Sequence, residues 1–198
     1  MLLLQEKSEE QLATISNLDR IKSEIEIAMR QKYSDFYMDN GTEDAEDTIE
    51  RILTLFGNAR EPKNHKRYVY MGYAMALASF PTAMNYMGND QRFELILNYV
   101  PKWLEDKKTE IIVAENWFDL SREARGNDSI TDTIYLFYYL IKSLSWEDVY
   151  ESLVEMLYVG LLGDAINPLP QKRRNVFNWW LTAVVPASYS LRLPTFGV

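Results

Sequence analysis

Hydrophobic residues recur along this chain at steps of three and four, the spacing that places side chains on one face of an α-helix. The first such series contains Leu12, Ile15, Leu18 and Ile21, with polar or charged residues at most of the positions between them. The pattern predicts a long amphipathic helix over about residues 8–38, part of which extends outward as an arm.

The same spacing continues through the rest of the chain, and residues that start or stop helices separate the segments. Gly57 ends the second segment, and Ser129 and Ser145 each precede an Asp by three residues, as in a capping box. We expect further helices over about residues 42–56, 67–79, 90–99, 109–125 and 175–184, and helices that begin at Ser129 and Ser145. Pro81 should end the third helix or start a short new one, and Pro101 should open one more turn.

Two stretches between these helices read as loops: residues 58–67, which are basic, and residues 160–174. No stretch longer than a few residues alternates polar and apolar positions, so we expect no sheet. The prediction is an all-α, single-domain array of seven or eight helices. A long N-terminal helix or arm covers residues 1–40, the helical core covers 41–185, and an irregular tail covers 186–198.

Composition narrows the chemistry that this fold can carry. The 198 residues contain no cysteine and one histidine, His65, which excludes disulfides, thiolate metal sites and multi-histidine metal sites. The net charge of −8 disfavours nucleic acid as a partner. Serine nucleophile elbows, Walker-type loops, dinucleotide fingerprints and EF-hand loops are absent. We therefore expect no cofactor and lean towards a protein that is not an enzyme.

Two uncharged stretches, residues 68–89 and 175–191, approach the length of a membrane span. Each is too polar for a bilayer and is interrupted by a proline, Pro81 or Pro186. The N-terminal sequence MLLLQEKSEE has a short apolar run and the wrong charge for a signal peptide. The sequence predicts no membrane span and a cytoplasmic location.

Carboxylates at helical spacing form the first candidate site. Four acidic residues share one face of the second helix, and four more lie on the helix that follows Ser145, as could suit a Mg²⁺ or Mn²⁺ site. The candidate metal ligands are Glu43, Glu46, Asp47, Glu50, Glu147, Asp148, Glu151 and Glu155. Charge runs near helix N-termini are also common as solvated faces that balance the helix dipole.

Basic residues form the second candidate site, just before the third predicted helix. Cations near a helix N-terminus suit a phosphorylated ligand or an acidic partner surface. The candidate anion-binding residues are Arg60, Lys63, His65, Lys66 and Arg67. The same residues are also compatible with an exposed loop that binds nothing.

The C-terminal segment combines cations with large aromatic residues, the residue types enriched at binding hot spots. Residues 165–198 contain no acid, whereas residues 1–59 contain 13 acids and 6 bases. This uneven distribution of charge favours head-to-tail contact between copies of the chain, or contact with another protein. The candidate partner-binding residues are Lys172, Arg173, Arg174, Phe177, Trp179, Trp180, Tyr189 and Phe196. Packing of these aromatics in the core is the competing interpretation.

Together these features predict a non-catalytic helical protein that acts through protein–protein contacts, as an assembly component, adaptor or regulator. Its partner is another protein or a second copy of the chain. Two alternatives remain open. One is a Mg²⁺- or Mn²⁺-dependent all-α hydrolase that uses the two carboxylate clusters. The other is a carrier of an apolar small molecule, lined by the methionine-rich helix around Met71 and Met75.

Overall fold

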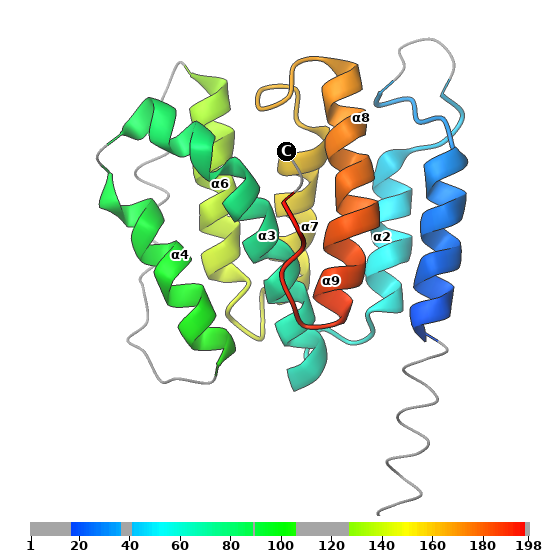
Figure 1. Cartoon of the computed structure of the whole chain (residues 1–198), viewed down its shortest axis with the longest axis horizontal. Helices are drawn as coiled ribbons and strands as arrows, with labels where there is room; N and C mark the ends of the chain where they lie inside the picture. The colour runs from blue at the N-terminus through cyan, green and yellow to red at the C-terminus, as the bar shows by residue number, and fades with distance from the viewer. Residues whose placement is uncertain (1–16, 37–40, 89, 106–126, 197–198) are drawn as a thin grey trace, which may run out of the picture.

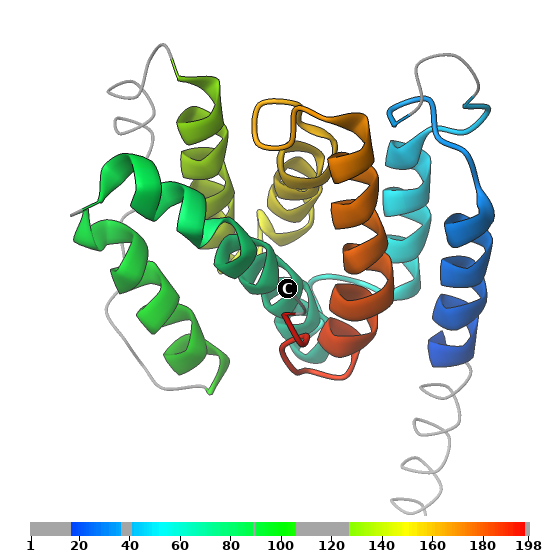
Figure 2. The ribbon, with the colours of Figure 1, turned by 45° about the horizontal axis from the view of Figure 1, so that its top comes forward.

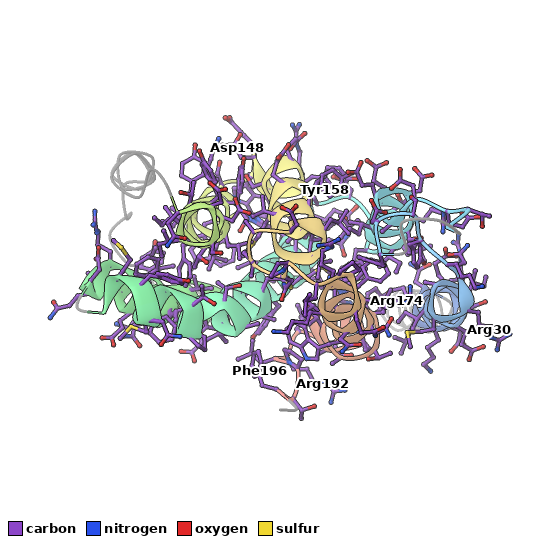
Figure 3. The ribbon with its side chains drawn as sticks, turned by 90° about the horizontal axis from the view of Figure 1, so that it is seen from above. Arg30, Asp148, Tyr158, Arg174, Arg192 and Phe196 are labelled. Carbon is purple, nitrogen blue, oxygen red and sulfur yellow. The ribbon has the colours of Figure 1, made fainter. Side chains whose placement is uncertain are left out.

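The computed structural model describes residues 17–36, 41–88, 90–105 and 127–196, and all the helices and turns in these ranges confirm an all-α fold. The β pairing within them is one isolated bridge between Tyr33 and Glu43. Seen from above, the helices form two layers (Figure 3): α6, α7 and α2 lie in one, and α3, α4, α8 and the N-terminal helix lie in the other.

In chain order, the elements are a helix over residues 17–30, α2 (Ala45–Leu55), α3 (Pro62–Met87), α4 (Gln91–Leu104), α6 (Asp128–Lys142) and α7 (Val149–Leu157). A π-helical turn, η1 (Tyr158–Leu162), continues α7. The last three elements are α8 (Pro170–Trp179), the π-helical turn η2 (Trp180–Val184) and α9 (Val185–Tyr189), which follow one another without a break. The described ranges therefore hold seven continuous helical segments, one of the two predicted numbers.

The N-terminal helix is shorter than the pattern predicted where the structure describes it. It ends at Arg30, and residues 31–36 are not helical, so the predicted helix to residue 38 is wrong over this part. The backbone here pairs with the chain before α2: Ser34 N–H donates to the Glu43 carbonyl at 3.0 Å. Gly41 permits this approach, because a Cβ there would collide with the backbone of Ser34. The remaining parts of the prediction, residues 8–16 and 37–38, lie outside the described ranges.

Helix α3 is longer than predicted at both ends. It begins at Pro62, a residue suited to a first helical turn, so residues 62–67 are helical and the predicted basic loop is shorter. It also continues through Pro81 to Met87, where we had expected a break. Proline removes one helical hydrogen bond, and here the packing of α3 on several helices outweighs that loss. Helix α4 passes through Pro101 in the same way.

Neither Ser129 nor Ser145 is the N-cap of the helix predicted to begin there. Helix α6 begins close to the predicted position, but Asn127 caps it by accepting a hydrogen bond from Ile130 N–H. Ser129 instead donates to the carbonyl of Ala165. Asp148 precedes α7 without a side-chain cap bond. The predicted helix over residues 109–125 falls outside the part of the chain that the structure describes.

The last helix begins five residues before the predicted start and includes Pro186. A proline ring clashes with the carbonyl four residues earlier in an α-helix. Here the π-helical turn η2 precedes it, and Val185 N–H donates to the Trp180 carbonyl, five residues back. The helix therefore runs to Tyr189, and the irregular part of the predicted tail begins at Ser190.

Arg174 joins the N-terminal helix to α8. Its side chain is buried, and its guanidinium donates to the carbonyls of Met29 at 3.0 Å and Ala28 at 3.5 Å, at the C-terminal end of the N-terminal helix. The same guanidinium lies 5.0 Å from the centre of the Tyr33 ring. Figure 3 shows Arg174 between α8 and the N-terminal helix. A cation at a helix C-terminus is favoured by the helix dipole and by the free carbonyls there.

Arg173 makes a parallel connection to the turn that follows the N-terminal helix. It donates to the Asp35 carbonyl at 3.3 Å and to the Asn167 carbonyl at 3.1 Å. Two neighbouring arginines thus bind three chain segments through backbone oxygens. Within the described ranges, no helix is both long and apolar enough to cross a membrane.

We predict that Arg174→Met lowers the free energy of unfolding by about 2 kcal/mol, because buried carbonyls lose a charged donor while the apolar stem is kept. Urea unfolding followed by circular dichroism measures this change. Lys172→Met is the matched control on the exposed side of the same helix, and it should change stability by less than about 0.5 kcal/mol. Equal effects of the two substitutions would contradict the anchoring role of Arg174.

Candidate functional site

An apolar groove of about 480 Å³ lies between α3 and α8, in the size range of ligand and peptide pockets. The C-terminal segment forms part of its wall. Its lining residues are Leu77, Ala78, Pro81, Asn175, Val176, Trp179 and Phe196. In Figures 1 and 2 the red C-terminal segment lies between α3 and the orange-red helix formed by α8 and α9.

A tight reversal after α9 directs this segment back over the groove. Leu191 has a φ of 55°, a left-handed conformation that is uncommon for a leucine. Two backbone bonds close the turn: Leu191 N–H donates to Ser188, and Arg192 N–H donates to Ala187, both at 3.0 Å. The chain then runs back beside α8 instead of continuing away from the body (Figure 1).

Beyond the turn, residues 193–196 are held by side-chain packing. Among the described residues they form no hydrogen bond, and they belong to no helix. Pro194 is buried, and the Phe196 ring lies 5.9 Å from the Trp179 ring. Phe196 nevertheless remains 46% exposed. A segment fastened in this way can adjust its position at low cost in free energy.

The groove lies between two elements without acidic residues. Helix α3 contains no Asp or Glu, and neither do residues 165–198, although the whole chain contains 29 acids. Lys172, Val176 and Trp179 are spaced so that they share one face of α8. Lys172 and Arg192 are exposed. The surface beside the groove is therefore apolar with a cationic edge.

The structure divides the eight predicted partner-binding residues into two groups. Arg174, Phe177, Trp180 and Tyr189 are buried, so they contact their own chain and are not available to a partner. Arg173 is bound to backbone carbonyls of the same chain. The three that face outward are Lys172, Trp179 and Phe196. Helical geometry explains the division, because residues 174, 177 and 180 follow one face of the helix and 172, 176 and 179 follow another.

The five predicted anion-binding residues are also divided. Arg60 and Lys63 are exposed and Lys66 is partly buried, but His65 and Arg67 are buried. Because the segment is helical, its side chains point in different directions. The five predicted residues therefore do not form one cluster. Arg60, Lys63 and Lys66 stay predicted anion-binding residues.

Arg67 has a structural role like that of Arg174. Its guanidinium donates to the Tyr189 carbonyl at 2.9 Å and to the Asn64 side-chain oxygen at 2.9 Å. It also lies 3.7 Å from the centre of the Tyr189 ring, a cation–π contact. Arg67 thereby fixes the end of α9 against the start of α3, close to the reversal that directs the C-terminal segment.

The eight predicted metal ligands lie on α2, on α7 and just before each of them. Six are exposed, and Glu43 and Asp148 are partly buried. Tyr158 connects the two helices by donating to a Glu50 carboxylate oxygen at 3.1 Å, and burial together with this contact raises the Tyr158 pKa. Within the described ranges, no three acidic or histidine side chains converge on a possible metal position.

A second, more polar pocket of about 340 Å³ lies between the loop after α2 and the start of α7. Its lining residues are Thr54, Gly57, Asn58, Ala59, Arg60, Trp146, Glu147, Val149, Tyr150 and Glu151. Trp146 is 46% exposed here, and its other side contacts His65 with ring centres 4.4 Å apart. The pocket thus combines one aromatic wall with exposed charges of both signs.

His65 is a buried packing residue. Its Nε2–H donates to the Ser143 carbonyl at 2.8 Å, and Trp103 and Trp146 contact its ring. Burial lowers the pKa of His65 from its ordinary value of 6.5. The neutral ring therefore joins α3 to the connection between α6 and α7.

The methionines of α3 fill the core. Met71 and Met75 are buried, and Met75 reaches the space beside Gly160 of η1. This position agrees with a central packing helix. The groove residues of α3, Leu77, Ala78 and Pro81, are not among the predicted site residues, because the sequence predicts that Pro81 ends the helix or starts a short new one. The helical spacing of Lys172, Val176 and Trp179 is the sequence feature that indicates the outward face of α8, which forms the other wall of the groove.

The chain matches no protein family model, and neither the curated proteins nor the solved structures give a match to it.

We predict that protein stability falls as the pH drops below about 6.5, because the folded state binds a proton at His65 less tightly than the unfolded chain does. The slope contributed by this residue can reach at most about 1.4 kcal/mol per pH unit. Above that pH the ring is neutral in both states and contributes no slope. His65→Gln keeps a donor for Ser143 and should flatten the profile just below about pH 6.5. Urea unfolding at several pH values tests this, and an unchanged slope in the variant would contradict it.

We also predict that about 5 mM Mg²⁺ or Mn²⁺ leaves the melting temperature unchanged, because the described carboxylates do not converge. A metal bound only to the folded state would raise it. Differential scanning calorimetry with and without metal makes the measurement. A rise that disappears in a Glu46→Gln, Glu50→Gln double variant would instead support the hydrolase alternative.

Proposed function

We propose that the protein acts through protein–protein contacts, as an assembly component, adaptor or regulator, and that it does so at the groove between α3 and α8. The observation that carries this proposal is the pair of aromatic side chains, Trp179 and Phe196, that lines an open apolar groove. Large aromatic residues with nearby cations are the usual hot spots of protein interfaces. We further propose that it works in the cytoplasm, on the sequence argument given above.

The chemistry of the groove selects one kind of occupant, an acidic segment of a partner protein that carries an aromatic or aliphatic side chain. The apolar side chain packs beside Trp179 and Phe196. The acidic groups lie near Lys172 and Arg192, where opposite charges guide the approach of the partner. Within the described ranges the backbone groups of residues 193–196 form no hydrogen bond, and they offer further bonds that suit a peptide chain better than a small apolar molecule.

Crosslinking from the groove tests this proposal. A photoreactive phenylalanine analogue replaces Ala78, an exposed groove residue, and the matched control replaces Leu95, which is 61% exposed on α4. We expect a discrete adduct with one protein from position 78 and none from position 95. The crosslinked protein is then identified, purified and titrated against the chain.

In that titration, Ala78→Glu should weaken binding by at least about tenfold, because it places a carboxylate in the acid-free groove. Leu95→Ala should leave binding unchanged. Equal crosslinking from both positions, or binding that is insensitive to Ala78→Glu, would overturn the proposal. Co-purification of a small apolar molecule in native mass spectrometry would favour the carrier alternative instead.

A further inference from the structure

A second surface of this protein combines acidic groups with an exposed aromatic side chain, as the proposed occupant of the groove does. Trp146, Glu147 and Glu151 line the same pocket at the start of α7, and all three are exposed. We call these three residues the acidic corner. The accessible ring of Trp146 can pack on an apolar surface such as that of Trp179 and Phe196. The two carboxylates are opposite in charge to Lys172 and Arg192.

One further carboxylate lies on the neighbouring helix. Helix α2 packs beside α7, and its exposed Glu50 accepts a hydrogen bond from Tyr158, which follows α7. Two cations are also near. Lys142 is paired with Asp148 at 3.4 Å, and Arg60 lines the pocket itself. The corner itself presents two exposed carboxylates, Glu147 and Glu151, in contrast to the acid-free groove.

The two surfaces lie on opposite sides of the molecule. Figure 3 shows Asp148, the residue after Glu147, at one edge and Arg192 and Phe196 at the opposite edge, with the two helical layers between them. A copy cannot bring its own acidic corner to its own groove. The same separation leaves both surfaces of each copy accessible at once.

We propose that the partner is a second copy of this chain, whose acidic corner docks in the groove between α3 and α8 so that copies associate head to tail. This inference rests on the proposed use of the groove for protein contact and identifies its occupant. The exposed edge of Trp146 packs beside Trp179 and Phe196, and Glu147 and Glu151 face Lys172 and Arg192. Because the contacting surfaces differ, the interface is heterologous, and each added copy presents a new groove.

Solution mass is the first test. Light scattering coupled to size exclusion, at chain concentrations up to about 100 μM, should give a mass that rises with concentration above the 23.2 kDa of one chain. The rise should be smaller in about 0.5 M salt than in about 0.05 M salt, because salt screens the charged contacts. A mass of one chain at every concentration would overturn the inference.

Complementation between two variants distinguishes this geometry from a symmetric dimer. Ala78→Glu blocks the groove and leaves the acidic corner intact, whereas Trp146→Ala removes the aromatic side chain of the corner and leaves the groove intact. Each variant alone should remain at the mass of one chain. Their equimolar mixture should reach twice that mass and no more, because one compatible pair of surfaces is present. A mixture that stays at the mass of one chain would overturn the inference.

Two controls keep the result interpretable. If Trp146→Ala loses helical circular dichroism, because Trp146 also contacts His65, the exposed pair Glu147→Ala and Glu151→Ala replaces it. Leu95→Ala, on an exposed part of α4, should associate like the original chain. If the chain does not self-associate but Ala78→Glu still weakens the binding of a different protein, identified by crosslinking from position 78, then this inference fails and the proposed function stands.

Discussion

The contact between Arg174 and the end of the N-terminal helix is the constraint on which the arrangement of the chain depends. A buried guanidinium needs hydrogen-bond acceptors, and the free carbonyls of Ala28 and Met29 supply them. The contact fixes the N-terminal helix against α8. It also fixes the rotation of α8 about its axis, because the side chain of residue 174 must point into the protein. Everything on the opposite side of α8 must then face outward.

This rotation separates the C-terminal cluster into core and surface residues. Phe177 and Trp180 follow Arg174 into the core, where Phe177 contacts both Tyr33 and Phe36. Lys172, Val176 and Trp179 follow the other face, and Val176 and Trp179 form part of one wall of the groove. The residues of this cluster are neighbours in the sequence, but they have two roles. Some pack in the core, and the others lie at the surface beside the groove.

The end of the chain depends on two further local features. The π-helical turn η2 allows the last helix to include Pro186 and reach Tyr189, where Arg67 binds it. The left-handed Leu191 then reverses the chain over α3 and α8. Because residues 193–196 are held by side-chain packing, the wall that carries Phe196 is the adjustable side of the groove. The opposite wall belongs to helices fixed in the core.

The sequence by itself determined the all-α class, most helix positions and the uneven distribution of charge, since these follow from spacing and composition that act locally. It did not determine where helices pass through Pro81 and Pro186, because tertiary packing offsets the lost backbone bonds. Nor did it show which cations are buried. Arg67 and Arg174 find carbonyl acceptors from segments far away in the sequence, and only the folded chain brings these together. The groove exists for the same reason, since its walls come from residues 77–81, 175–179 and 196.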